Sequence, residues 1–78
     1  MSKSKNFIIG EKEVMKGIEN GKIKKIIFAS NCPEFIRTKF EKIDIEKENF
    51  SGNEEELGAY IGKAFPIAIV GVKNENNS

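Results

Sequence analysis

Two short apolar runs limit most strongly what this chain can fold into. Residues 26–29 read IIFA and residues 66–72 read PIAIVGV, and neither run alternates apolar with polar side chains. A strand that is apolar on both faces has to be covered on both faces, usually by helices. The runs therefore predict two buried strands, the first of them central, in a sheet that lies between helices.

The remaining segments alternate between strand and helix patterns. Residues 7–9 read FII and predict a short strand, whereas residues 44–50 follow an alternation of apolar and charged side chains that predicts an exposed or edge strand. Helical spacing predicts helices over about residues 11–20, 32–43 and 54–62. This order predicts an α/β fold in which one mainly parallel sheet of four strands lies between helices.

The last two predicted helices have start signals and apolar faces. Asn31 can cap the second helix and Asn53 the third, and each is followed three residues later by a glutamate. The apolar faces are predicted to consist of Phe35, Ile36, Phe40 and Ile43 in the second helix and of Leu57, Tyr60 and Ile61 in the third.

The length of 78 residues predicts one small domain over residues 1–78, with an ordered core over about residues 7–72. A domain of this size buries only about 60% of the surface that its unfolded chain exposes. The polar segments at residues 1–5 and 74–78 are predicted to fray as tails. No apolar run reaches the roughly 18 residues of a membrane span, and the first residues lack a signal peptide's apolar stretch. We therefore expect a cytoplasmic protein without a membrane partner.

The available side chains exclude several kinds of catalytic and metal site. Cys32 is the only cysteine and the chain has no histidine, which excludes a disulfide, a zinc knuckle and a histidine-dependent triad within it. No dinucleotide or P-loop glycine motif follows a predicted strand. The three glutamates at residues 54–56 fit the acidic first turn of a helix better than a metal site. We predict no enzymatic activity, no cofactor, no metal and no small-molecule substrate.

Charge is distributed unevenly along the chain. Residues 1–43 contain ten Lys and Arg against five Asp and Glu, whereas residues 44–78 contain three against seven. A basic first half is compatible with a side that faces a polyanion. Solvated helix faces explain the same distribution, so charge alone leaves both possibilities open.

Two predicted turns, at Gly10 and Asn31, each lead from a strand into a helix. Such turns present backbone N–H groups at helix N-termini, and turns that follow strands of one direction open on the same edge of the sheet. Lys12 and Lys16 lie one helical turn apart and can point together from the first helix. These residues predict an anion-binding edge, with simply solvated lysines as the alternative.

Several segments resemble the ribosomal L7Ae/L30e family and are closest to its L30e branch. They are residues 10–18 (GEKEVMKGI), residues 25–33 (KIIFASNCP), residues 50–58 (FSGNEEELG) and residues 62–65 (GKAF). The similarity extends over about residues 7–72. It implies a three-layer α/β/α sandwich with a four-stranded, mainly parallel or mixed sheet.

The resemblance also implies a non-catalytic ribosomal protein of the large subunit that binds a kink-turn in ribosomal RNA, with neighbouring ribosomal proteins as possible partners. In this family the segment matching residues 10–16 contacts guanines of tandem G·A pairs, and an apolar loop packs beside a flipped-out nucleotide, as apolar groups do with unstacked bases. The RNA-binding residues that the resemblance implies are Gly10, Glu11, Lys12, Glu13, Lys16, Asn31, Phe65, Pro66 and Ile67. Among them Glu13 suits a base edge better than a phosphate.

Alternatives remain open for single residues and for the whole chain. Phe65 is equally consistent with a core residue, because its neighbours are apolar, and Asn31 can serve only as a helix cap. Six residues precede the first strand, where family members usually have another helix, and the segment between residues 33 and 50 is shorter than usual. The alternative function is a protein-interaction module of the same fold that uses the edge near residues 43–50.

Overall fold

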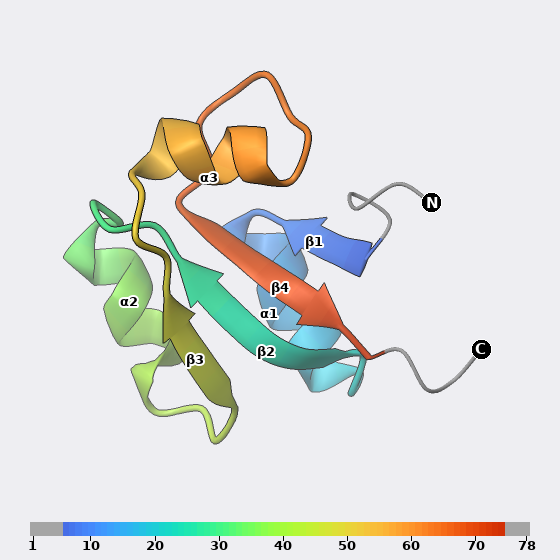
Figure 1. The fold of residues 1–78 in the computed structure, drawn as a ribbon. Helices are drawn as coiled ribbons and strands as arrows, with labels where there is room; N and C mark the ends of the chain where they lie inside the picture. The colour runs from blue at the N-terminus through green and yellow to red at the C-terminus, as the bar shows by residue number, and fades with distance from the viewer. Residues whose placement is uncertain (1–5, 75–78) are drawn as a thin grey trace.

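The computed structural model describes residues 6–74, in which strands and helices alternate (Figure 1). The strands are β1 (Phe7–Ile9), β2 (Ile23–Phe28), β3 (Glu46–Asn49) and β4 (Ile69–Lys73), and the helices are α1 (Glu11–Glu19), α2 (Glu34–Glu41) and α3 (Glu54–Tyr60). The tails predicted at residues 1–5 and 75–78 lie outside the described residues. Asn74, which was also assigned to a tail, donates its backbone N–H to the Lys22 carbonyl oxygen at 2.8 Å and therefore continues the folded part.

The strands of residues 6–74 form a mixed sheet in the order β1-β4-β2-β3. β1 and β2 each pair with β4 in antiparallel fashion, whereas β3 pairs with β2 in parallel. Ile9 at the end of β1 lies opposite Val70 near the start of β4, and Phe28 at the end of β2 lies opposite Ile69. β1, β2 and β3 therefore end at the edge of the sheet where β4 begins.

The direction of β4 follows from the shortness of α3. The predicted sandwich with a four-stranded sheet is confirmed, and the sheet is mixed, one of the two forms that the resemblance implied. The mainly parallel sheet predicted from the order of elements alone is wrong, because two of the three strand pairings are antiparallel. A parallel β4 would require the chain to return along the whole sheet before entering the strand. α3 has only seven residues, about 10 Å of helix, and lies across the end of the sheet (Figure 1). The chain therefore enters β4 at the end where β3 stops.

The core lies on both faces of the sheet. On one face α1 and α2 pack against β2, and the buried residues there include Val14, Ile26, Phe28, Ile36 and Phe40. On the other face α3 packs through Leu57 and Ile61 against residues that include Ile27, Ala29 and Val70. Successive residues from Ile26 to Ala29 thus alternate between two apolar clusters, which confirms that β2 is a central strand covered on both faces.

Two aromatic residues that spacing assigned to buried helix faces are exposed. Phe35 is 63% exposed and Tyr60 is 48% exposed. Ile36 and Phe40, four residues apart, form the buried face of α2, and Phe35 lies roughly 100° around the helix from Ile36. The Tyr60 ring lies at the margin of the α3 face, where its centroid is 5.2 Å from that of Phe50.

The boundaries of the predicted strands shift for local reasons. β4 begins at Ile69, later than residue 66, because Pro66 has no N–H to donate to a neighbouring strand and the Ile67 N–H donates to the Glu54 carbonyl oxygen at 2.9 Å. β2 begins earlier than predicted and includes Lys25, whose Nζ pairs with Glu48 Oε1 on β3 at 2.7 Å. β3 is an edge strand with all of its residues exposed, as the alternating pattern predicted.

α3 begins with the predicted capping box. The Asn53 side chain accepts a hydrogen bond from the Glu56 N–H at 2.9 Å, and the Glu56 carboxylate accepts one from the Asn53 N–H at 2.8 Å. Each bond satisfies a backbone donor that the helix leaves without a partner. Within residues 6–74, no helix has the length and apolar character needed to cross a bilayer.

Gly58 is the position at which α3 touches the loop before β4. A Cβ atom there would collide with the Phe65 carbonyl oxygen, which as a backbone atom cannot swing aside. We expect Gly58→Ala to lower the free energy of unfolding by about 1–2 kcal/mol, because this overpacking outweighs the better helix propensity of alanine. Urea unfolding followed by circular dichroism measures the change.

Ala59→Ser, at the next and exposed position of α3, is the matched control for this substitution. It should change the free energy of unfolding by less than about 0.5 kcal/mol. An unfolding midpoint of Gly58→Ala equal to that of the unsubstituted protein would contradict the tight contact between α3 and the loop.

Candidate nucleic-acid interface

Connecting segments from distant parts of the chain meet at the edge where β1, β2 and β3 end and β4 begins. This edge, called the rim below, consists of Gly10 with the start of α1 as far as Lys16, of residues 29–33 with the first turn of α2, and of residues 50–53 and 65–68. The Ser30 N–H donates to the Gly52 carbonyl oxygen at 2.9 Å, and the Ala29 N–H donates to that of Ala68 at 2.9 Å. The turns at Gly10 and Asn31 do share an edge, as predicted, and the antiparallel β4 adds the loop before it.

Gly10 starts α1 directly at the rim. It is the N-cap residue of α1, and its φ of 98° is a conformation that residues with a side chain rarely adopt. Its carbonyl oxygen accepts the first helical hydrogen bond, from the Val14 N–H at 2.9 Å. A Cβ atom placed on Gly10 would meet nothing within 4 Å. The outer side of this turn is therefore bare backbone that a partner can approach closely.

The charged residues at the start of α1 fall into two groups. The Glu11 carboxylate forms an ion pair with Lys39 Nζ on α2, and its side chain is only 25% exposed. Lys12, Glu13 and Lys16 are exposed. Glu11 therefore ties α1 to α2, while the other three present their charges outward from α1.

Asn31 links the turn after β2 to the start of α3, and it does not cap α2 as its position predicted. The N-cap residue of α2 is Pro33, without a side-chain cap hydrogen bond. Asn31 Oδ1 instead accepts a hydrogen bond from the Glu54 N–H, at the first residue of α3, at 2.9 Å. Because the oxygen serves the fold and the residue is exposed, the side-chain NH₂ group is the donor that Asn31 can offer to a partner.

The loop before β4 has an exposed tip and a buried anchor. Phe65 is 52% exposed and Pro66 is also exposed, which settles the question of whether Phe65 belongs to the core. Ile67 is only 3% exposed and packs in the cluster beneath α3. The prediction that the Ile67 side chain lies on an RNA-binding surface is therefore wrong. Its role is to hold the loop so that Phe65 and Pro66 project from it.

A shallow hollow of about 170 Å³ lies within the rim. Gly10 and Glu11 line it from the start of α1, Ile36 from α2, and Pro66 from the loop before β4. An exposed phenyl ring stands next in sequence to two of these lining residues, Phe35 beside Ile36 and Phe65 beside Pro66. The hollow is thus mainly apolar, with Glu11 at one side, and Phe65 lines a second hollow that shares Pro66.

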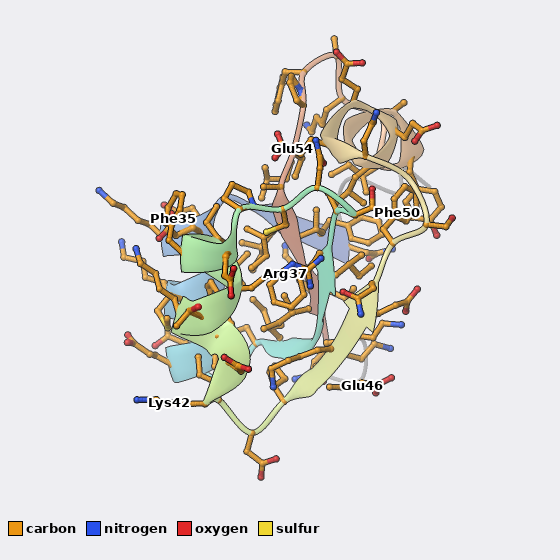
Figure 2. The ribbon with its side chains drawn as sticks, turned by 90° about the vertical axis from the view of Figure 1, so that its left-hand side faces the viewer. Phe35, Arg37, Lys42, Glu46, Phe50 and Glu54 are labelled. Carbon is orange, nitrogen blue, oxygen red and sulfur yellow. The ribbon has the colours of Figure 1, made fainter. Side chains whose placement is uncertain are left out.

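Arg37 stabilises the rim through hydrogen bonds to the ends of two strands. Its Nη2 donates to the Ala29 carbonyl oxygen at 3.1 Å, and its Nη1 donates to Asn49 Oδ1 at 2.8 Å. The guanidinium carbon lies 5.1 Å from the centre of the Phe28 ring, a cation–π distance. Figure 2 shows Arg37 reaching from α2 toward the sheet. One side chain thereby joins α2 to the ends of β2 and β3.

The chemistry of the rim suits binding better than catalysis. Burial raises the pKa of the Cys32 thiol, which keeps the sulfur protonated and poorly nucleophilic. Residues 6–74 contain no group of three or more His, Cys, Asp or Glu side chains placed to hold a metal ion. What the rim offers is exposed backbone, an amide donor, charges of both signs and aromatic rings.

We did not predict from the sequence that Phe35 is exposed next to the rim, or that Arg37 and Lys39 form contacts there. The spacing of Ile36 and Phe40 alone already defines the buried face of α2, so it could have identified Phe35 as exposed. Arg37 and Lys39 bind side chains 12 and 28 residues away. No local pattern indicates contacts at such separations.

Curated proteins similar to this chain include several named Large ribosomal subunit protein eL30. The protein of that name from Archaeoglobus fulgidus is 36% identical over 73 residues, covering 94% of this chain and 85% of that protein. Its counterpart from Methanosarcina mazei is 33% identical over 76 residues, covering 97% of this chain and 74% of that protein.

Solved structures with the same fold include two of differing similarity. A protein of unknown function from Bacillus halodurans C superposes with a TM-score of 0.80 at 27% identity, covering 91% of this chain and 74% of that one. The 15.5kD RNA binding protein of Giardia lamblia has a TM-score of 0.74 at 17% identity, covering 92% of this chain and 63% of that one, and shows the fold alone.

A comparison with protein families matches residues 1–78 as a whole. The match confirms the resemblance carried by residues 10–18, 25–33, 50–58 and 62–65. The chain belongs to the Ribosomal protein L7Ae/L30e/S12e/Gadd45 family.

Proposed function

We propose that this protein is a non-catalytic RNA-binding protein of the large ribosomal subunit, in the cytoplasm, and that its rim recognises a kink-turn in ribosomal RNA. The observation that carries the proposal is the meeting of Gly10, Asn31 and the Phe65–Pro66 tip at one edge of the sheet. The similarity to proteins named Large ribosomal subunit protein eL30 supports the ribosomal assignment. Neighbouring ribosomal proteins would be further partners.

Charge favours α1 over α3 as the side that faces phosphates. Lys12 and Lys16 are exposed on α1, whereas α3 begins with three glutamates beside Asn31. Lysines attract phosphates and release their counterions, and carboxylates repel them. In the proposed complex the RNA backbone therefore passes along α1, and the rim between α1 and α3 meets the bases.

Glu13 takes part in this proposal as a base-reading residue. A carboxylate accepts hydrogen bonds and so cannot bind a phosphate, but it can accept from the amino group of a guanine. The bare backbone at Gly10 allows the first turn of α1 to enter a groove closely enough for such a contact. The Asn31 amide adds a donor on the other side of the groove.

The exposed tip at Phe65 and Pro66 supplies the apolar part of the interface. Proteins that recognise RNA by sequence often stack unpaired bases on aromatic side chains. Because the tip is anchored by buried Ile67, Phe65 is held at the rim in advance of binding. We assign it the role of packing on a flipped-out nucleotide.

The alternative function, a protein-interaction module that uses the β3 edge, has less support from the described residues. Glu46, Lys47 and Glu48 are exposed along this edge strand. Charged side chains on an edge strand oppose pairing with a strand of another chain. Lys47 Nζ also donates to the Ile43 carbonyl oxygen at 2.6 Å, so part of this edge is already occupied.

Substitutions at the start of α1 test the rim directly. Lys12→Ala and Glu13→Ala should each weaken binding to a kink-turn RNA by roughly 1–3 kcal/mol, because each removes a contact to a base or a phosphate. Fluorescence anisotropy titrations at a fixed salt concentration measure the dissociation constants.

Lys42→Ala and Glu19→Ala are the matched controls, since both residues are exposed and lie at the helix ends far from the rim (Figure 2 shows Lys42). Their dissociation constants should equal that of the unsubstituted protein. Equal affinities for all four variants would reject α1 as the binding surface.

The shape of the RNA should matter as well as its charge. We expect the protein to bind a kink-turn RNA more tightly than a straight duplex of equal length, and the affinity to fall as salt rises, because bound lysines release counterions. Gel shifts with both RNAs at several salt concentrations provide the comparison. Equal affinity for the two would contradict kink-turn recognition, and binding to neither would favour the protein-interaction module.

A further inference from the structure

Phe35 is the most exposed large apolar side chain among residues 6–74, at 63%, compared with 52% for Phe65 and 48% for Tyr60. Single exposed apolar residues are common on protein surfaces, so exposure by itself says little. Tyr60 packs against the rings of Phe7 and Phe50 on the far side of the sheet. Phe35, in contrast, belongs to the first turn of α2, which begins at the rim.

Two observations place Phe35 near the hollow in the rim. Ile36, the next residue, lines the hollow together with Gly10 and Pro66. Lys39, one helical turn further along α2, is ion-paired with Glu11 at the start of α1. Because Phe35 and Lys39 share a face of α2, the ring lies one turn closer to the rim than this ion pair. Figure 2 shows Phe35 at the end of α2 opposite to Lys42.

Phe35 and Phe65 each precede, in sequence, a residue that lines the hollow. These lining residues are Ile36 on α2 and Pro66 on the loop before β4. Phe65 itself lines a second hollow, which shares Pro66 and also includes Ala59 and Lys63. Exposed rings near small hollows suit a flat ligand group, and aromatic side chains stack on any nucleobase. Positive charge comes from exposed Lys12 on α1 and from Lys39 on α2, whose side chain is 53% exposed.

We propose that Phe35 is a second base-stacking residue of the rim, which packs on an unpaired nucleotide of the bound RNA beside the hollow that Ile36 lines. This inference rests on the proposed RNA-binding function and extends its surface from α1 and the Phe65 tip onto α2. Phe35 contributes through its ring face and carries no charge. Its contribution to affinity is therefore independent of salt, unlike that of a lysine that contacts phosphate.

The test uses the full chain and a kink-turn RNA with tandem G·A pairs next to unpaired nucleotides. Phe35→Ala should raise the dissociation constant between about five-fold and about a hundred-fold, the range expected for loss of one base–aromatic stack. Phe35→Tyr keeps the ring and should stay within about two-fold of the unsubstituted protein. Phe35→Leu keeps an apolar side chain but not the ring, and should resemble Phe35→Ala.

A matched control and two further readouts separate stacking from a structural effect. Thr38→Ala, also exposed on α2, should leave the dissociation constant unchanged. The slope of affinity against salt should be the same for Phe35→Ala and the unsubstituted protein. The base analogue 2-aminopurine is placed at each unpaired position in turn. At one position its fluorescence should be quenched when the unsubstituted protein binds and not when Phe35→Ala binds. An abasic site at that position should weaken RNA binding by the unsubstituted protein. It should not weaken the binding of Phe35→Ala beyond the loss that this substitution already causes.

The possible failures are distinguishable. If the unsubstituted protein does not bind the kink-turn RNA, the proposed function fails and the role of Phe35 fails with it. If it binds, and Phe65→Ala weakens binding while Phe35→Ala does not, only the inference about Phe35 is overturned. Equal losses for Phe35→Ala and Phe35→Tyr, or a changed salt slope for Phe35→Ala, would also overturn it.

Discussion

The antiparallel pairing of β4 with both β1 and β2 is the constraint on which the rim depends. Ile9 opposite Val70 and Phe28 opposite Ile69 set the start of β4 beside the ends of its two neighbours. A parallel β4 would carry the Phe65 loop to the opposite end of the sheet, away from α1 and Asn31. The short α3 enforces this direction, and Gly58 lets the helix and the loop touch closely. Strand direction thus decides which side chains can act on one ligand.

Several polar residues of the rim and next to it form hydrogen bonds or ion pairs within the protein itself. Glu11 ties α1 to α2 through Lys39, and Asn31 ties the end of β2 to the start of α3. Arg37 joins α2 to the ends of β2 and β3. A surface braced in this way loses little conformational freedom when a ligand binds, so more of the contact energy appears as affinity.

The parts of the fold that depend on local patterns were predictable, whereas those that depend on distant partners were not. The apolar run at residues 26–29 predicted a central strand, and Asn53 predicted a helix start, because each signal lies within one turn or one strand. Asn31 was misassigned because its partner, Glu54, lies 23 residues away. The family resemblance placed Ile67 on the RNA-binding surface, whereas the apolar run at residues 66–72 already predicted a buried segment, and Ile67 lies beneath α3. The rim residues themselves came from family resemblance, since physics alone predicted only an anion-binding edge.

The most direct test of the central claim is to map which amides respond when a kink-turn RNA is added to the isotopically labelled protein. Two-dimensional NMR spectra recorded during the titration report each backbone N–H separately. If the rim binds the RNA, the signals of Gly10, Lys12, Asn31 and Phe65 shift or broaden together while those of β3 stay in place. Shifts confined to β3, with the rim signals unchanged, would contradict the account.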